Sequence, residues 1–443
     1  MPPEFSLRSL LPPGPNGVKR LYPAVYFYAL LLIVVTMPYA YAVNSTTAFI
    51  LAGFWLLGGD WAGKWQRLRR RPLAWLFMAP YLMEILGMLY THRPAEGLFV
   101  LQKKVLLFAF PLLLATIPPL SRRQVRHVLL AFVASCVAGS LYCLGSGLYY
   151  ALVLGQPDRL FYHELARFIN MQGIYLSLYT GFCILVLVHC VLHEWQTLSP
   201  AFRRAALATA VYLTGFTVLL SVRTALAALA FLGAGLLLRF FYVHRRLAVG
   251  LAAITAALLL LAGLLYLNPV SKQKFAEAFS TGETIPLHQA TDQSLGRNWG
   301  GKALRFAIWQ CTANVVRQRP LFGVGTGSTQ DALQAGYKAC NFDFAYRFNR
   351  YNAHNQFLET WVGLGLAGLT LLLAALLVPL YRALRAAHYL YVLLIVFFAI
   401  NSLTESTLER QKGVLFYAFF NALLAFHGHQ DSAREVTRRF PES

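Results

Sequence analysis

The sequence predicts an all-α polytopic membrane protein with about twelve membrane-spanning helices and one large, partly helical loop between the ninth and tenth helices. Of its 443 residues, 57% are hydrophobic and only 13% are charged, and the mean hydropathy is +0.51. This apolar content exceeds what the core of a soluble protein of this size requires. The apolar segments are about 17–25 residues long and continuous, which favours spanning helices over alternating barrel strands.

The positions of the apolar segments define the spans and the domain division. The spans are centred near residues 30, 50, 81, 108, 138, 181, 213, 232, 257, 369, 395 and 419. We therefore expect residues 1–267 to hold the first nine spans, 268–356 to form a loop domain, and 357–443 to hold the last three spans and a tail. The Pro-rich start, "MPPEFSLRSLLPPGPNGVKR", lacks a cleavage site and is predicted to be a cytoplasmic tail.

Basic residues in the short loops predict the orientation. They fall on alternate loops, in "GKWQRLRRRP", "SRRQVRH", "HRR", "YRALRAAH" and the tail "SAREVTRRF". Because lysine and arginine are retained on the cytoplasmic side, both termini are expected inside. The formal net charge of +21 then reflects topology and contact with anionic lipid headgroups, and no feature of the sequence supports nucleic-acid binding.

The same alternation places residues 268–356 on the outer face. Basic residues outnumber acidic ones there, and because long loops escape the charge rule, this excess needs another explanation. An anionic ligand is one explanation, and a solvated surface or headgroup contact is the other. The stretch "GGKALRFAIWQCTANVVRQRP" has helical periodicity and is predicted to end at Pro320.

Cys311 and Cys340 both lie in this loop. An oxidising outer compartment would allow them to form a disulfide, although their spacing says nothing about the distance between them. The pair is therefore a candidate disulfide.

Motifs of soluble enzymes fail on spacing. In "GVGTG", the glycines Gly323, Gly325 and Gly327 are not spaced as in a dinucleotide fingerprint, so a turn is expected. The pairs His163-Glu164 and His193-Glu194 lack the second histidine of a zinc protease helix, and no cluster has metal-ligand spacing. We therefore expect neither a metal ion nor a cofactor.

Ionisable residues gather at the outer ends of the spans. Arg223 interrupts the apolar stretch "LLSVRTALAALAFL", where a charge is costly and usually faces a cavity or a partner. Arg305 lies on the predicted loop helix. The other ionisable residues at these ends are Lys103, Lys104, Arg159, Arg167, Glu405, Glu409, Arg410 and Lys412. For them, a functional role competes with the interpretation that the side chain only extends to the membrane interface.

The tract "YNAHNQFLE" is polar, yet it directly precedes the apolar "TWVGLGLAGLTLLLAALLVPL". It places His354 at the outer mouth of the tenth span, close to Asn355 and Glu359. An interfacial histidine is often structural, but an imidazole, with an ordinary pKa of about 6.5, also suits proton transfer near neutral pH. With arginines on the same face, a base combined with an anion clamp is a reasonable hypothesis.

The order of four segments resembles the O-antigen ligase family. They are "SVRTALAAL", the loop stretch "RFAIWQCTANVVRQRPLFGVGTG", then "YNAHNQFLETWVGLGLAGL", and finally "NSLTESTLERQKGVLFY". The elements "HNxxLE" and "PLFGVGxG" together are typical of a superfamily that also includes O-antigen polymerases and bacterial O-oligosaccharyltransferases. The motifs cover about residues 200–425, and topology alone carries the likeness elsewhere.

This resemblance implies transfer of a glycan from undecaprenyl pyrophosphate to the lipid A core oligosaccharide, at the periplasmic face of a bacterial inner membrane. His354 matches the family's catalytic histidine, and Arg223 and Arg305 match its essential arginines. The implied mechanism is metal-independent and inverting, with His354 as general base and the arginines holding the pyrophosphate. Asn355 or Glu359 is expected to orient the imidazole; further candidates for supporting roles are Tyr351, Arg159, Arg167 and Lys103.

Other functions stay open at this point. A polymerase or a protein-glycosylating transferase would use the same donor and the same histidine. A transporter of an anionic lipid belongs to a different class, and it predicts discontinuous helices near the membrane midplane together with an internal repeat. No obvious repeat is present, and the polar residues gather at one face.

Overall fold

The computed structural model describes residues 21–39, 41–193, 198–268, 270, 272 and 301–427. This part of the chain is helical and contains no strand, which confirms the all-α prediction for it. The long helices are α1 (Leu21–Thr36), α2 (Tyr41–Leu57), α4 (Pro72–Gly87), α5 (Pro94–Lys104), α6 (Leu106–Thr116), α7 (Arg122–Leu152), α9 (Gly173–His193), α10 (Pro200–Leu219), α11 (Arg223–Val243), α12 (Leu247–Leu267), α15 (Gly301–Gln318), α16 (Thr329–Ala339), α17 (Gln356–Arg385), α18 (Tyr389–Ser402) and α19 (Gln411–His427). Two short helices are α3 (Trp61–Arg69) and α8 (Tyr162–Arg167).

Each predicted span centre lies inside one of these helices, on α1, α2, α4, α6, α7, α9, α10, α11, α12, α17, α18 and α19. Among the described residues, 7 helices are long and apolar enough to cross a membrane. Three shorter apolar helices lie on α1, α2 and α18. The chain is thus a helical membrane protein, and twelve crossings stay a prediction.

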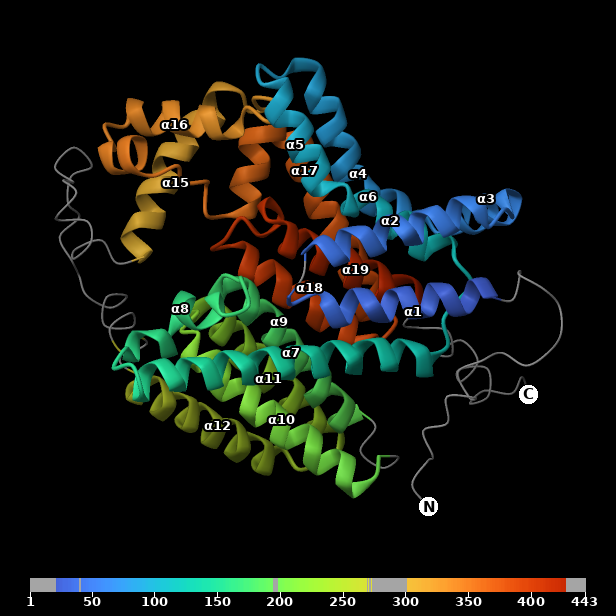
Figure 1. The fold of residues 1–443 in the computed structure, drawn as a ribbon, viewed down its shortest axis with the longest axis vertical. Coiled ribbons are helices and arrows are strands. Elements are labelled where there is room, and N and C mark those ends of the chain that lie inside the picture. The colour runs from blue at the N-terminus through green and yellow to red at the C-terminus, as the bar shows by residue number, and fades with distance from the viewer. Residues whose placement is uncertain are drawn as a thin grey trace.

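The helices form a bundle with a smaller helical unit beside it (Figure 1). Helix α19 is buried along most of its length and packs its aromatic rings against α7 and α9. The ring centroids of Phe132 and Phe420 are 4.8 Å apart, and those of Tyr179 and Phe416 are 5.3 Å apart. Aromatic pairs at such distances contribute beyond their buried area, so α19 is the central element of the bundle.

The smaller unit is built from α15 and α16, which stand together at the upper left of Figure 1. It has its own core, in which Ile308, Cys311, Leu333, Tyr337 and Phe342 are fully buried. Helix α15 is the predicted loop helix, and it ends just before Pro320 as expected from proline's lack of an N–H donor. This unit carries Arg305 and leads directly into the segment that carries His354.

Helix α17 is broken at Gly365, where φ is 67° and ψ is −165°. The break exposes backbone groups that the turn after α15 satisfies. Leu366 and Ala367 donate their N–H groups to the carbonyls of Pro320 and Leu321, at 2.8 and 3.1 Å. In return, Val324 and Gly325 donate to Val362 and Gly363, at 3.0 and 2.9 Å. Irregular backbone inside a membrane bundle persists when protein groups bond to it in this way.

The glycines of "GVGTG" make this close approach possible, and the expected turn is confirmed. A Cβ atom on Gly323 would lie 2.5 Å from the Val362 carbonyl oxygen, and one on Gly327 would lie 2.3 Å from the Gly97 nitrogen. Both glycines have positive φ values, which other residues rarely adopt. The turn therefore attaches the α15–α16 unit to α5 and α17.

Candidate functional site

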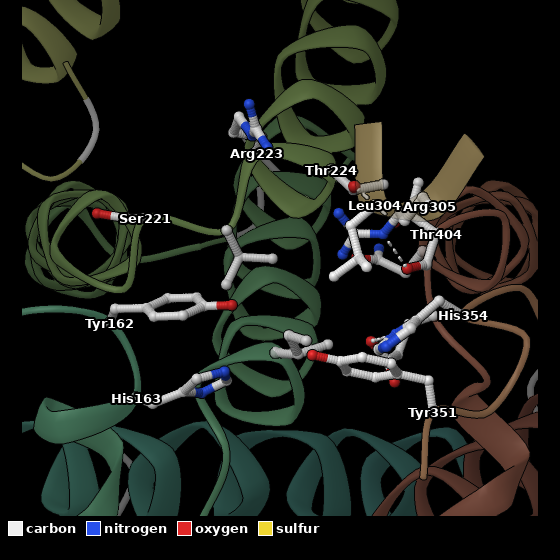
Figure 2. Close-up of a pocket in the computed structure, with 14 residues that line it drawn as sticks. Tyr162, His163, Ser221, Arg223, Thr224, Leu304, Arg305, Tyr351, His354 and Thr404 are labelled. Atoms are coloured by element: carbon white, nitrogen blue, oxygen red, sulfur yellow. Dashed lines mark hydrogen bonds and ion pairs between the residues drawn. The ribbon is translucent and has the colours of Figure 1, made fainter. Parts of the chain in front are cut away.

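A cavity of about 280 Å³ lies where several separate parts of the chain meet. Arg223 comes from the first residue of α11, Arg305 from α15, and His354 from the segment before α17. Tyr162 and His163, from α8, lie across from His354 and Tyr351 (Figure 2). The structure thus brings together four of the residues singled out from the sequence, namely Arg223, Arg305, Tyr351 and His354.

The segment of residues 351–355 is held by hydrogen bonds to its backbone. Trp309 Nε1 donates to the Ala353 carbonyl at 3.0 Å, and the Ala353 N–H donates to Glu359 Oε2 at 2.7 Å. The His354 N–H donates to Asn352 Oδ1 at 3.0 Å. His354 itself has a φ of 45°, in the left-handed region, which costs about 1–3 kcal/mol and persists only where surrounding contacts hold it.

The side chains of Asn355 and Glu359, which are expected to orient the imidazole, bond to other groups in this structure, and their role toward His354 stays a prediction. Asn355 Oδ1 caps α17 by accepting from the N–H groups of Phe357 and Leu358, and its Nδ2 donates to the Leu403 carbonyl. Glu359 bonds to Ala353 and accepts from the Ser406 hydroxyl at 3.4 Å. Both side chains accept hydrogen bonds from backbone N–H groups. The first turn of a helix and the irregular loop before it leave such groups without a partner in the backbone.

Glu405 is the carboxylate nearest the imidazole. Its Oε2 lies 3.5 Å from His354 Nδ1, and the two side chains are 11% and 24% exposed. Within the described part of the chain, neither atom has a hydrogen-bond partner, although both are buried. An Nδ1–H group that donated to this carboxylate would leave Nε2 as the proton acceptor.

Arg305 is positioned by the turn that carries Glu405. Its Nε donates to the Thr404 carbonyl at 3.0 Å, and the Thr404 hydroxyl lies 2.7 Å from that of Thr224, the second residue of α11. The pKa of the Tyr162 phenol is raised above its ordinary value, and burial is the main cause. The positive charges of Arg305 and Arg223 act to lower this pKa, and the carboxylate of Glu405 acts to raise it. Two guanidinium groups and one carboxylate therefore act on the same small space.

A larger cavity of about 1240 Å³ adjoins the first. Both cavities are lined by His163, Ile174, Tyr351, His354 and Glu405, so His354 lies at their junction. The larger one is lined by apolar residues of α2 and α5 and by charged residues that include Lys103 and Glu359. Its size exceeds that of common small-molecule sites, which suits a bulky, amphipathic ligand.

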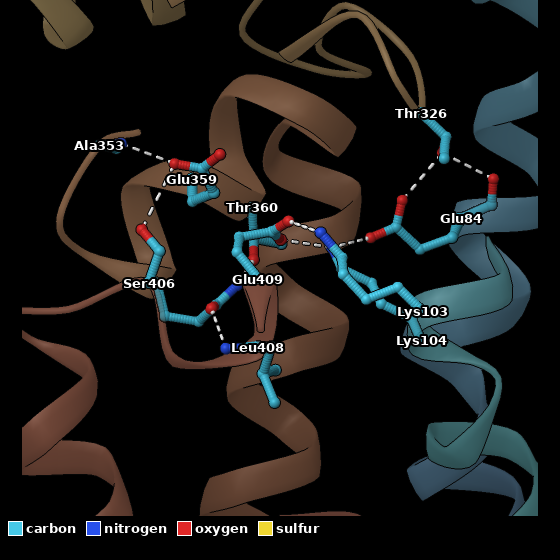
Figure 3. Close-up of polar contacts among 11 residues, drawn as sticks. Glu84, Lys103, Lys104, Thr326, Ala353, Glu359, Thr360, Ser406, Leu408 and Glu409 are labelled. Atoms are coloured by element: carbon cyan, nitrogen blue, oxygen red, sulfur yellow. Dashed lines mark hydrogen bonds and ion pairs between the residues drawn. The ribbon is translucent and has the colours of Figure 1, made fainter. Parts of the chain in front are cut away.

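A buried ionic network forms one wall of the larger cavity (Figure 3). Lys104 lies between Glu84 and Glu409, at 2.7 and 2.5 Å, and Lys103 pairs with Glu409 at 2.9 Å. The Thr326 hydroxyl of the glycine-rich turn bonds to Glu84 Oε2 at 2.9 Å. Burial alone would raise the pKa of Glu409, but Lys104 and Lys103 outweigh it and lower the pKa to about 2. Lys103 is thus held in an ion pair.

Other residues named from the sequence lie elsewhere. Arg159 and Arg167 line neither cavity and instead pair with Glu164, at 2.9 and 2.7 Å. Cys311 and Cys340 interact with one another but are not joined by a disulfide in this structure, and burial together with the Cys340 thiol raises the pKa of Cys311. Their bonding stays a prediction. Among the described residues, no three His, Cys, Asp or Glu side chains are grouped as metal ligands.

Sequence reasoning missed two residues of the site. Glu405 stood out only as an ionisable residue in the outer turn, and nothing in the spacing links it to His354. His163 was weighed only as half of a metal motif. A hydrophobicity profile places each residue at the outer ends of the spans, but it does not say which loops meet.

The comparison with protein families supplies independent evidence. A family model described as O-antigen ligase matches residues 208–373, a segment that contains Arg223, Arg305 and His354. Glu405 and His163 lie outside it. No curated protein matches the chain closely enough to add a relative.

Proposed function

We propose that the protein is an O-antigen ligase, from the premise that residues 208–373 match a family model described as O-antigen ligase. It transfers O-antigen glycan from undecaprenyl pyrophosphate to the lipid A core oligosaccharide. One observation carries this proposal: Arg223, Arg305 and His354, from three separate segments, line a single cavity.

In this mechanism, the two guanidinium groups bind the pyrophosphate of the donor. The acceptor hydroxyl gives its proton to Nε2 of His354 while its oxygen attacks the anomeric carbon. The bond from that carbon to the pyrophosphate oxygen breaks, so undecaprenyl pyrophosphate leaves and the anomeric configuration inverts. Arginine suits the clamp because its planar fork donates two hydrogen bonds to phosphate oxygens, and fixed cations stabilise the charge that develops on the leaving group.

The paired cavities support separate places for the two substrates. The smaller cavity holds both arginines and suits the pyrophosphate. The larger cavity, which shares His354, suits the lipid A core, because its lining is partly apolar and partly charged. A base at the junction can then reach a hydroxyl from one side and the anomeric carbon from the other.

The proposed setting is a bacterial inner membrane, with both termini cytoplasmic and the active site facing the periplasm. Residues 268–356 form the periplasmic loop domain, between a part with nine spans and a part with three. Transfer needs neither a metal ion nor a nucleotide, because the lipid pyrophosphate is already an activated leaving group. Membrane lipids surround the spans and account for much of the positive charge.

A transporter would be favoured by one observation, the discontinuity of α17. Discontinuous helices often bind substrates through the backbone groups that the break exposes. At Gly365, however, the backbone of the turn Pro320–Gly325 forms four hydrogen bonds with the backbone groups that the break exposes. The break therefore supports an anchoring role, and we retain the ligase.

The decisive experiment measures glycan transfer by purified protein from undecaprenyl-pyrophosphate glycan to lipid A core, with a chelator present. The wild type is expected to transfer, and the His354→Ala variant is not. His244→Ala is the matched control, because His244 is exposed at the far end of α11 from Arg223.

Equal transfer by wild type and His354→Ala would exclude His354 as the catalytic base. Activity that disappears with chelator would exclude the metal-independent mechanism. Folded protein that glycosylates a lipid-linked repeat or a protein, but not lipid A core, would identify it as a polymerase or a protein-glycosylating transferase.

A further inference from the structure

Two arginines of the larger cavity have no role in the mechanism proposed above. Arg93 immediately precedes α5, Arg350 lies four residues before His354, and both line this cavity. Their side chains are 61% and 73% exposed, whereas Lys104 and Glu359 in the same lining are buried. The two arginines therefore lie where the cavity opens to water, and the buried ionic network lies in its interior.

A shared carboxylate holds the two arginines together. Arg93 Nε lies 2.6 Å from Asp331 Oδ2, and Arg350 Nη2 lies 3.5 Å from Asp331 Oδ1. Asp331 belongs to α16, so these contacts join the α15–α16 unit to the start of α5 (Figure 1). One carboxylate neutralises only one of the two guanidinium groups, which leaves one positive charge at the opening.

Most hydrogen-bond donors of the two guanidinium groups stay available to a ligand. Apart from the contacts with Asp331, the side chains of Arg93 and Arg350 make no hydrogen bond or ion pair with the residues that the structure describes. A guanidinium group carries five N–H donors, and its planar fork matches two oxygens of a phosphate or a carboxylate. Two such forks at one opening form a site for an anionic group.

Glu96 is a second carboxylate in this part of the lining. It is exposed, lies in the first turn of α5, and forms no ion pair with the described residues. The starts of α5 and α16 each carry about half a positive charge, and together they match the charge of Glu96. The opening as a whole therefore stays positive.

We propose that Arg93 and Arg350 bind an anionic group of the acceptor glycolipid. This inference rests on the proposed function, which places the acceptor in the larger cavity, and it names a binding site for that substrate. The same cavity is lined by His354, so an acceptor held at the opening can present a sugar hydroxyl to the imidazole. Fixing one end of the acceptor in this way lowers the entropy that the reaction step must lose.

The chemistry of the site fits a phosphate or a carboxylate carried by a sugar of the acceptor. It also bears on the excess of basic residues in the segment 268–356, for which an anionic ligand is one of two explanations. Arg350 is one of those basic residues. The proposal gives its charge a ligand on the acceptor side of the reaction, whereas Arg223 and Arg305 hold the donor.

The competing interpretation is that the two ion pairs only join α16 to α5. Asp331→Asn separates these roles, because it breaks both ion pairs and keeps both arginines. Arg347→Ala is the matched control for Arg350→Ala. Arg347 is 64% exposed, lies 3.5 Å from Asp343, and lines neither cavity. Exposed ion pairs contribute little to stability, so none of these variants is expected to melt at a lower temperature.

The experiment measures glycan transfer by full-length protein in detergent with three acceptors. They are lipid A core, lipid A core without its phosphate groups, and lipid A core with its carboxylates reduced to alcohols. For Arg93→Ala and Arg350→Ala we expect the KM of untreated lipid A core to rise about tenfold to a hundredfold, as for the loss of a charged hydrogen bond, with kcat little changed. Binding of undecaprenyl pyrophosphate should not change.

One of the two treated acceptors is expected to remove the difference in KM between the wild type and Arg350→Ala, and it identifies the anionic group as phosphate or carboxylate. Asp331→Asn should bind lipid A core at least as well as the wild type, because a competing carboxylate is gone.

A KM for Arg350→Ala equal to that of Arg347→Ala would overturn the proposal. A rise in KM for Asp331→Asn as large as that for Arg350→Ala would also overturn it and leave the arginines as a structural link. So would a difference in KM that persists with both treated acceptors, or weaker binding of undecaprenyl pyrophosphate. If the wild type transfers nothing to lipid A core, the proposed function fails, and direct binding of the three glycolipids would still test the two arginines.

Discussion

His354 Nδ1 lies 3.5 Å from Glu405 Oε2, and neither buried atom has a hydrogen-bond partner within the described residues. His354 precedes α17 in the chain, and Glu405 follows α18. They meet only because the loop before α17 packs against the turn after α18. An aligned carboxylate would hold the imidazole with Nε2 toward the substrate and stabilise the imidazolium that forms.

Glu405→Gln should therefore lower transfer about tenfold to a hundredfold. The charged and titratable groups that face this pair from the packed elements are Tyr162, His163, Arg223, Arg305 and Tyr351, and the substitution leaves all of them in place. Glu164→Gln is the control, since Glu164 pairs with Arg159 and Arg167 away from both cavities. Transfer by Glu405→Gln at the wild-type rate would exclude Glu405 as the residue that positions the imidazole.

Arg223→Ala and Arg305→Ala should each slow transfer about a hundredfold to a thousandfold, the usual loss for one charge-stabilising donor. Binding of undecaprenyl pyrophosphate should weaken in parallel, and both effects can be followed with purified protein. Arg167→Ala is the matched control, because Arg167 lines neither cavity. Normal binding of the pyrophosphate by both variants would exclude the clamp.

Gly365→Ala should destabilise the protein by about 3 kcal/mol, because φ is 67° and the new Cβ would lie 2.2 Å from the Leu321 carbonyl. Gly233→Ala, in α11 with nothing within 4 Å, should be neutral or stabilise by up to about 1 kcal/mol. Melting temperatures in detergent measure both. If the two variants melt alike, the break in α17 does not depend on glycine.

The ion pairs of Glu409 predict a pH dependence of stability. Its folded pKa of about 2 lies below the ordinary 4.5, so its contribution is present above 4.5 and is lost as the pH falls toward 2. Glu409→Gln should lower the melting temperature near neutral pH, and the gap to the wild type should shrink below pH 4.5. A gap that stays constant from pH 6 to pH 3 would show that the charge of Glu409 does not stabilise the fold.

Hydrophobic patterning predicts much of this fold because it acts locally. Each span centre lies inside a helix, and α15 ends beside Pro320 as expected. The sequence does not predict the break at Gly365, because a glycine within an apolar run is equally compatible with a continuous helix. Its cause lies in Pro320–Gly325, whose backbone replaces the helical hydrogen bonds.

What the sequence by itself determined is the class of the protein, the position of its helices, and the residues that cannot be buried without a partner. Those properties follow from the free energy of transferring each side chain out of water, which depends on local composition. Which charged residues meet was decided only by the tertiary structure. It placed Arg223, Arg305 and His354 around one cavity and gave His354 the carboxylate of Glu405, whereas Glu359, its neighbour in sequence, bonds to the backbone. Such pairings arise from helix packing and from satisfying buried backbone groups, and these depend on contacts between segments far apart in the chain.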